Sequence, residues 1–257
     1  TLDHSGSDYY ERYQKAIEEY AAECAIAKVF CSEQLDMVVD EAVQIHGGYG
    51  YISEYAVERY YRDSRIQRIF EGTNEINRIL IPTTLFRRAD GGSLDLWNKV
   101  EEAQEKMIML EVADNSQGKE EFTLEISLLA NLKVLFLGVL GAVAHVRGSQ
   151  EIMLALADMV ITIFALESVL LRAEQVFASA SDKKKEQLRG VVKVVAFERS
   201  AQFHLAASRC GGYAGLTEYR NMLRKNMQRL SYYPVEGLLA AKQLLAETSR
   251  DAGRYTL

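Results

Sequence analysis

The sequence is poor in residues that interrupt helices and in residues that form cross-links. Its 257 residues include only two prolines, Pro82 and Pro234, and no segment alternates apolar and polar residues over the length of a strand. So few breakers argue against a turn-rich β protein and favour long helices. The three cysteines, Cys24, Cys31 and Cys210, are odd in number and form no CxxC pair, which argues against a disulfide framework and favours a reducing compartment.

The sequence also lacks the patterns of metal sites, membrane spans and secretion. Its four histidines include no pair at positions i and i+4, so we expect no metal site. The longest apolar run, 134–144, is about half of what a membrane span needs, so we expect a buried helix and no transmembrane segment. The chain starts with Thr1 and has no basic-then-apolar leader, so we expect a piece of a longer polypeptide that is not secreted.

The charge balance is acidic, with a formal net charge of −6, which opposes non-specific binding to nucleic acid. The charge is uneven, because residues 182–229 carry eleven Lys and Arg against four Asp and Glu, a net +7. A run of this kind is usually a solvated helix face. The alternative is peripheral contact with an anionic membrane surface, or with an acidic partner.

Apolar residues recur at helical spacing along most of the chain, so we expect an all-α protein packed as helical bundles. Residues 8–46 are expected to form one long helix or two in series, ended by the glycines of His46-Gly47-Gly48. A tyrosine- and glycine-rich loop, 49–54, follows. The buried stripe expected along the first helix comprises Ile17, Tyr20, Cys24, Ala27, Cys31, Leu35 and Val38.

Further helices are expected over 57–65 and, after a turn at 70–72, from an N-cap at Thr73 to Leu85. The cluster 90–93 is a linker candidate that divides the chain into domains 1–90 and 91–257. The helices expected in the second domain are 93–114, 122–146, 150–178 and 181–209, the last closed by Gly211-Gly212, with a polar break at 115–119.

The two domains share an internal repeat. The string Gly47-Gly48-Tyr49, followed by Glu54-Tyr55, recurs with the same spacing from Gly211 onwards. One residue later in register, Glu71-Gly72 is repeated as Glu236-Gly237. We therefore expect the second domain to be a degenerate copy of the first helical unit. Because the counterpart of Thr73 is a leucine, we expect the second copy to have kept the packing and lost any chemistry of the first.

Three clusters in the first domain carry the candidate chemistry. They read QIHGGYGY at 44–51, VERYYRD at 57–63 and RIFEGTNEINR at 68–78. This ordered run resembles the C-terminal part of the acyl-CoA dehydrogenases, over roughly residues 15–90. The helical segment after Leu85 is similar to the very-long-chain type, whose members carry an extra C-terminal helical domain. The chain departs from the family pattern at Ala56, where the family usually has proline.

Glu71 is the candidate catalytic residue. It follows Phe70 at the entrance of a helix, so we expect the apolar neighbour to desolvate its carboxylate and suit it to act as a general base near neutrality. Backbone N–H groups at such a turn can hold a carbonyl oxygen, and Gly72 lets a ligand approach closely. The alternative from the residues alone is that Glu71 only stabilises the N-terminus of the helix through the macrodipole.

The resemblance implies a reaction. Glu71 would take the α-proton of a fatty acyl-CoA lying along Gly72, and FAD would accept the β-hydride, giving a trans-2-enoyl-CoA in fatty-acid β-oxidation. An electron-transferring flavoprotein would take the electrons. The FAD contacts that the resemblance implies are Gln44, Ile45, His46, Gly47 and Gly48, reaching a neighbouring subunit's cofactor, and Thr73, Asn74 and Glu75. Apart from the resemblance, His46 reads most simply as a structural residue at a helix end.

Family members also carry an N-terminal helical domain and a middle β-domain, so we expect a C-terminal fragment that is inactive alone. We expect a homodimer, in which the duplicated unit covers the surface used by four-subunit members. The compartment would be the bacterial cytoplasm or the mitochondrial matrix. Two alternatives stay open: a non-catalytic helical scaffold or membrane-associated assembly protein derived from the family, and an acyl-CoA oxidase.

Overall fold

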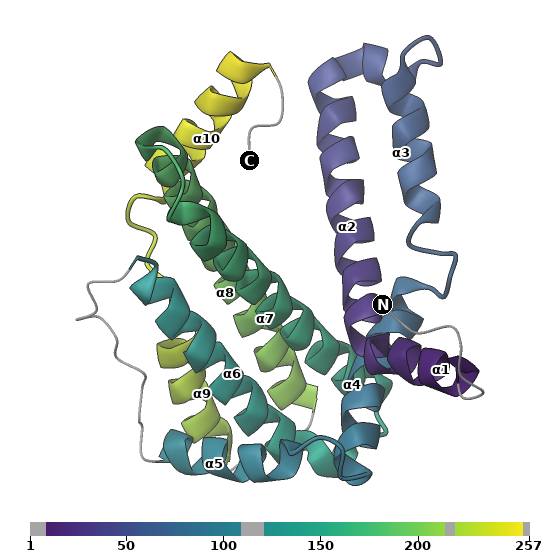
Figure 1. Cartoon of the computed structure of the whole chain (residues 1–257), viewed down its shortest axis with the longest axis vertical. Helices are drawn as coiled ribbons and strands as arrows, with labels where there is room; N and C mark the ends of the chain where they lie inside the picture. The colour runs from purple at the N-terminus through teal and green to yellow at the C-terminus, as the bar shows by residue number, and fades with distance from the viewer. Residues whose placement is uncertain (1–8, 109–120, 214–218, 254–257) are drawn as a thin grey trace. The chain divides into compact units, whose positions relative to one another are not determined.

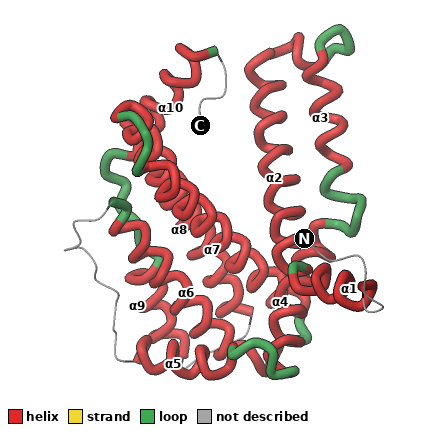
Figure 2. The backbone as a smooth tube through the Cα atoms, viewed as in Figure 1, coloured by secondary structure: helices red, strands yellow, loops and turns green. Residues whose placement is uncertain are grey.

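A computed structural model of the chain describes residues 9–108, 121–213 and 219–253. The regular elements in these ranges are all helical, and Figure 2 shows no strand among them, which confirms the all-α prediction. The chain divides into two compact units, the first ending at Leu94 and the second beginning at Asp95. Each unit is described by itself.

The first unit is built around one long helix, α2 (Ala21–His46). The helix α1 (Tyr9–Glu19) precedes it, and the 3-10 helix η1 (Gly47–Tyr51), α3 (Ala56–Ile66) and α4 (Asn74–Asp90) follow. Both α3 and α4 pack against α2 (Figure 1). The helix α2 ends at Gly47, which has a φ of 60°, as the two glycines predicted.

Local chemistry sets the start of α4. Thr73 is its N-cap, and the threonine hydroxyl accepts a hydrogen bond from the N–H of Ile76 at 3.3 Å, as predicted. The loop predicted over 49–54 is in part regular, because η1 occupies its first three residues.

The buried stripe predicted for the first helices is wrong. The predicted residues are exposed, with fractions between 43% and 66% for Ile17, Tyr20, Leu35 and Val38, and the two cysteines and Ala27 lie on the surface as well. The side chains that α2 buries lie on a different face: Ala22, Ala25, Ile26, Val29, Ser32 and Val39. Because α2 carries apolar side chains around most of its circumference, spacing alone did not select the face that packs.

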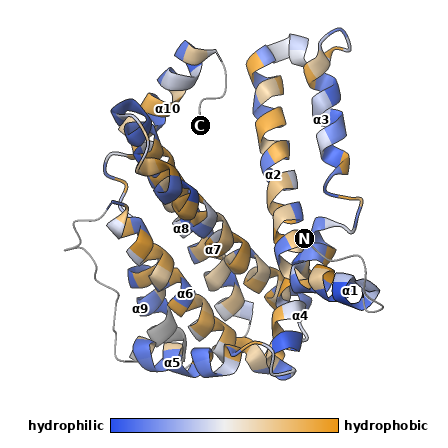
Figure 3. Ribbon diagram, viewed as in Figure 1, coloured by the Kyte–Doolittle hydropathy of each residue, from blue (hydrophilic) through white to orange (hydrophobic). Residues whose placement is uncertain are grey.

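The second unit contains α5 (Leu96–Ile108), α6 (Thr123–Val143), the 3-10 helix η2 (Ala144–Val146), α7 (Gln150–Phe177), α8 (Asp182–Tyr213), α9 (Tyr219–Leu230) and α10 (Leu238–Ala252). Its core lies where α6, α7 and α8 pack together, and Figure 3 shows apolar residues along α6 and α7. Leu132, Leu156 and Phe203, one from each of these helices, have no exposed surface. The predicted helices 122–146 and 150–178 are therefore confirmed.

The predicted end of α8 is wrong. The helix continues through Gly211 and Gly212 to Tyr213, and neither glycine takes a positive φ. A glycine inside a helix costs only about 0.5–1 kcal/mol relative to alanine, which tertiary packing readily overrides. In the same unit α5 begins at Leu96 rather than at residue 93. The end of the predicted helix 93–114 and the predicted break at 115–119 lie outside the described residues.

Two helical stretches, 123–146 and 150–177, are long and apolar enough to cross a membrane by length and composition. Both helices were predicted, but no uninterrupted apolar run in the sequence is long enough to indicate a membrane span. Half of each apolar window is buried inside the second unit. Core helices of globular bundles pass the same test, so these two helices carry no assignment to a membrane.

The helices of the two units follow one order. When the repeat is aligned through its matching glycines, α2, α3 and α4 overlap α8, α9 and α10 in turn. In both units the first of these helices packs against the two that follow. The glycine before the third helix also matches, because Gly72 has a φ of 78° and Gly237 a φ of 76°, whereas of the two preceding glutamates only Glu71 has a positive φ. These correspondences support the predicted duplication.

Candidate functional site

The segment between α3 and α4 folds into a tight turn that places Glu71 just ahead of α4. Glu71 and Gly72 are both in the left-handed region, with φ of 54° and 78°. For a residue with a side chain this conformation costs on the order of 1–2 kcal/mol, so surrounding contacts must hold it. The turn is closed by a hydrogen bond of 3.1 Å from the N–H of Asn74 to the carbonyl of Arg68.

Two side chains hold the carbonyl of Gly72. Asn77 Nδ2 donates to it at 2.8 Å and also reaches the carbonyls of Thr73, at 3.1 Å, and Glu71, at 3.4 Å. Lys28 Nζ, from α2, donates to the same Gly72 oxygen at 2.7 Å. The backbone of the turn is therefore tied to both α2 and α4.

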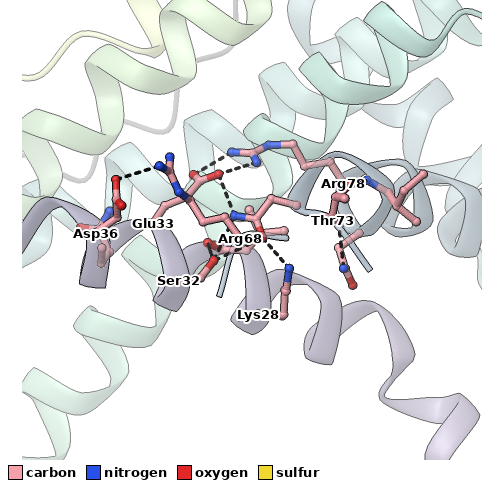
Figure 4. Close-up of polar contacts among 12 residues, drawn as sticks. Lys28, Ser32, Glu33, Asp36, Arg68, Thr73 and Arg78 are labelled. Carbon is pink, nitrogen blue, oxygen red and sulfur yellow. Dashed lines mark hydrogen bonds and ion pairs between the residues drawn. The ribbon is translucent and has the colours of Figure 1, made fainter. Parts of the chain in front are cut away.

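Polar side chains behind the turn join it and α4 to α2 (Figure 4). Asn74 is only 2% exposed; its Oδ1 accepts from Lys28 Nζ at 2.7 Å, and its Nδ2 donates to Ser32 Oγ at 3.0 Å and to Glu33 Oε1 at 3.1 Å. Arg78 donates to both oxygens of Glu33, at 2.6 and 2.8 Å. We call this set the α2–α4 polar cluster: Lys28, Ser32, Glu33, Asp36, Arg68, Asn74 and Arg78, with Arg68 and Asp36 paired at 3.2 Å.

Charges in and around this cluster are tuned by their neighbours. Burial lowers the pKa of Lys28, against the opposing charges of Glu75, Glu33 and Glu71. Burial would raise the pKa of Glu33, but the hydrogen bonds and charge of Arg78 outweigh it and leave that pKa below its ordinary value. The pKa of Glu75 is lowered by hydrogen bonds from its own N–H and from the Thr73 hydroxyl. Both carboxylates are therefore held ionised at neutral pH.

Glu71 lies on the surface, and Phe70 is 45% exposed. The prediction that Phe70 desolvates the Glu71 carboxylate is therefore wrong for the described part of this chain. The N–H groups of Glu71 and Gly72 donate no hydrogen bond to any described residue. The turn thus presents an accessible carboxylate and two free backbone donors, which is a combination that can meet a C–H acid and its carbonyl oxygen.

The predicted FAD contacts form two groups at different places on the first unit. Gln44, Ile45, His46, Gly47 and Gly48 are exposed around the C-terminal end of α2, whereas Thr73 and Glu75 lie beside Glu71. Ser32 contacts α4, and the helix from Ser32 to His46 measures about 20 Å at 1.5 Å per residue. The first unit therefore does not bring the two groups together.

Some of these residues are already engaged within the unit. The Asn74 side chain is buried in the α2–α4 polar cluster, so its amide is not available to a cofactor. The Thr73 hydroxyl accepts a hydrogen bond from the N–H of Ile76 at 3.3 Å. His46 Nδ1 is hydrogen-bonded to the carbonyl of Ala42 at 2.8 Å, which agrees with the structural role read from the sequence.

The backbone at Gly47 and Gly48 is open to approach. A Cβ atom added at either glycine would meet no atom within 4 Å among the described residues. No side chain therefore obstructs the approach of a phosphate oxygen to this backbone, although the N–H of Gly47 already donates to the carbonyl of Gln44.

A hollow of about 820 Å³ lies between α2, η1 and α3. Charges of both signs line it, including Asp40, Glu58, Arg62 and Arg65. Neither Glu71 nor any predicted FAD contact is among its lining residues, so the predicted site is a surface turn and not this hollow. The described residues also contain no group of three His, Cys, Asp or Glu side chains placed to hold a metal ion.

Sequence reasoning missed Lys28 and Asn77, the two residues that hold the turn. Lys28 is 44 residues from Gly72, so no local pattern connects them. The internal repeat gives no direct signal either, because in the register of Gly47 and Gly211, which aligns α2 with α8, the residue opposite Lys28 is Val192, and Lys193 lies one position further on.

Two family models match the chain. A model described as acyl-CoA dehydrogenase, C-terminal domain, matches residues 9–86, and a second model with the same description matches residues 131–211. A probable acyl-CoA dehydrogenase of Bacillus subtilis is 46% identical over 176 residues, which are 67% of this chain and 30% of that protein. The mitochondrial very long-chain specific acyl-CoA dehydrogenase of Mus musculus is 48% identical over 67 residues, 26% of this chain and 10% of that protein.

A solved structure resembles the whole chain. The crystal structure of an acyl-CoA dehydrogenase from Bacillus anthracis, complexed with FAD, matches with a TM-score of 0.92 and 35% sequence identity. The match covers 100% of this chain and 44% of that one. The chain therefore spans less than half the length of the relatives that it matches.

Proposed function

The chain belongs to the acyl-CoA dehydrogenase family, and from this premise we propose that it supplies the catalytic base and part of the FAD site of an enzyme that oxidises fatty acyl-CoA to trans-2-enoyl-CoA. The observation that carries the proposal is the turn before α4. There a glutamate is held in left-handed backbone with its carboxylate exposed and its N–H free, at the position where the sequence resembles the family's base.

Glu71 acts on the α-carbon of the thioester. A carboxylate oxygen of Glu71 takes the α-proton, and the N–H of Glu71 donates to the thioester carbonyl oxygen, where negative charge develops. Gly72 has no side chain to obstruct the acyl chain beside the turn. When bound, FAD would supply the acceptor for the hydride that leaves the β-carbon. The substrate therefore loses one proton from its α-carbon and one hydride from its β-carbon, and a double bond forms between these two carbons.

The exposed glycines at the end of α2 support a role in cofactor binding. We assign the phosphate-bearing half of FAD to the backbone of Gly47 and Gly48, and a second contact to the start of α4 at Thr73 and Glu75. Because about 20 Å of α2 separates the two groups, each group would serve a different cofactor molecule or a different part of one. The FAD complex of the Bacillus anthracis relative supports the choice of cofactor.

An electron-transferring flavoprotein is the proposed electron acceptor, with the bacterial cytoplasm or the mitochondrial matrix as the compartment. The acyl-CoA oxidase alternative differs only in passing electrons to oxygen, so oxygen uptake by the intact protein during turnover separates the two.

Because the described part of this chain leaves Glu71 exposed, the apolar cover that a base needs would come from outside that part.

The test is Glu71→Gln in the intact protein, with Glu236→Gln as the matched control. Glu236 is also exposed and also precedes a glycine with positive φ, but it belongs to the second copy. We expect Glu71→Gln to retain FAD, measured by its absorbance, and to lose about 10²–10⁴-fold in acyl-CoA oxidation with an artificial electron acceptor. The control should keep its activity.

Retained activity in Glu71→Gln would contradict the proposed base. The scaffold alternative predicts a different result, namely that the intact protein with both glutamates in place turns over no acyl-CoA.

A further inference from the structure

We propose that Lys28 is a positioning residue for Glu71, because its ammonium group holds the Gly72 carbonyl and so fixes the left-handed turn from which Glu71 acts. The inference rests on the proposed function of Glu71 and deepens it.

The contacts of Lys28 give it this role. Its Nζ donates to Gly72 O and to Asn74 Oδ1, both at 2.7 Å, so one side chain from α2 joins the turn to the first residue of α4. The carbonyl that it holds belongs to the residue directly after Glu71. Rotation of the Gly72 backbone would move the carboxylate and the N–H of Glu71 together, and two donors on one carbonyl resist that rotation.

Lys28 differs from Arg68 and Arg78 in the groups to which it donates hydrogen bonds. Arg68 and Arg78 form ion pairs with Asp36 and Glu33. The hydrogen bonds of Lys28 go instead to a carbonyl and an amide oxygen, and the carboxylates of Glu71, Glu75 and Glu33 attract its charge without bonding to it.

The second unit has a comparable but not identical contact. Lys193 lies one position beyond the residue that aligns with Lys28 in the register of Gly47 and Gly211, and it donates at 3.2 Å to the carbonyl of Glu236, the counterpart of Glu71 rather than of Gly72. The positions that correspond to Asn74 and Asn77 are Leu239 and Lys242. A lysine on the long helix therefore contacts the turn in both units, whereas the hold on the carbonyl after the glutamate, and the two asparagines, occur only where the turn carries the proposed base.

The two copies provide a matched pair of variants, Lys28→Met and Lys193→Met, in the intact protein with FAD bound. Methionine keeps the unbranched shape and most of the length of the side chain and removes its charge and donors. We expect Lys28→Met to lower kcat by about 10–100-fold, as misplacement of a catalytic group by about 1 Å does, while KM and FAD content change less than about twofold. We expect Lys193→Met to leave kcat unchanged, and Lys28→Arg to recover most of the lost kcat.

The proposal is overturned if Lys28→Met keeps the kcat of the unmodified protein, or if Lys193→Met lowers kcat equally, since either result means that the lysine only stabilises the fold. Asn77→Leu removes the other donor to the Gly72 carbonyl and should lower kcat in the same way, so the test stands if Lys28→Met does not fold. An inactive Glu71→Gln combined with a fully active Lys28→Met refutes the role of Lys28 alone. An active Glu71→Gln refutes the proposed base itself.

Discussion

At Gly72 the backbone requires a residue without a side chain for two independent reasons. Its φ of 78° is strained for any other residue, and an added Cβ would lie 3.1 Å from Asn77 Nδ2, the atom that holds the turn. We expect Gly72→Ala to lower the free energy of unfolding by about 1–2 kcal/mol, measured by urea titration, and to lower kcat because Asn77 must move.

Gly148→Ala is the control for this prediction, because Gly148 has an ordinary φ and an added Cβ there meets nothing within 4 Å. We expect it to change stability by less than about 0.5 kcal/mol. Equal effects of the two alanines would mean that neither the φ nor the contact with Asn77 matters.

Single residues show how far the sequence alone could reach. The Thr73 cap follows from local chemistry and was predicted, since a threonine directly before a helical pattern is a preferred N-cap residue. Asn74 was predicted to meet the cofactor, yet its amide is consumed by Lys28, Ser32 and Glu33, all on α2. These partners are distant from Asn74 in the chain, and only the fold brings them to it.

Between elements, the pair of Glu33 on α2 and Arg78 on α4 predicts a pH dependence. Burial would raise the pKa of Glu33, but Arg78 more than compensates and the folded-state pKa lies below the ordinary 4.5. The pair's contribution is therefore fully present above pH 4.5 and is lost as the pH falls through the lowered folded pKa. We expect Arg78→Gln to cost about 1–2 kcal/mol at pH 7 in urea unfolding, and the cost to shrink towards pH 3.

Arg62→Gln is the comparison for Arg78→Gln. Its pair with Glu58 joins two positions of one helix at 3.3 Å, and the Arg62 side chain is 80% exposed. We expect a change of less than about 0.5 kcal/mol that varies little with pH. A pH-independent cost of Arg78→Gln would show that packing, and not the charge of Glu33, joins α2 to α4.

Helices were easier to predict than the faces by which they pack. The lengths of α3, α6 and α7 follow from apolar spacing and caps, whereas the packing face of α2 does not, because Cys24 and Ala25 are both small and apolar and only one is buried. Gly47 and Gly211 show the same limit. One ends a helix and the other continues it, and glycine allows either conformation without stating which one the fold requires.

Across the molecule, the basic stretch 182–229 is partly engaged within the second unit. Lys185 and Arg189 lie 5.5 and 5.0 Å from the centre of the Phe177 ring, Arg189 also pairs with Glu121, and Arg199 is buried. These contacts favour a structural role for part of the charge. Membrane contact stays a prediction, which co-sedimentation of the intact protein with anionic vesicles tests directly.

The distance along α2 between the two proposed cofactor contacts bears on how the subunits are arranged. The resemblance implies that residues 44–48 contact a neighbouring subunit's FAD, and the structure separates them from Glu71 by about 20 Å of helix. We therefore expect a homodimer by light scattering after gel filtration, in which each active site combines Glu71 of one subunit with Gly47 and Gly48 of the other. A mass of four subunits would contradict the dimer.

Mixing two inactive variants tests the shared site. Glu71→Gln removes the base, and Gly48→Glu places a charge where phosphate would approach, at a position where an added Cβ meets no described atom within 4 Å. Unfolded together and refolded as an equal mixture, they should regain about a quarter of the unmodified activity, because half of the dimers are mixed and each mixed dimer has one complete site. If both groups served the same subunit's cofactor, every site would carry one defect and the mixture would stay as inactive as its parents.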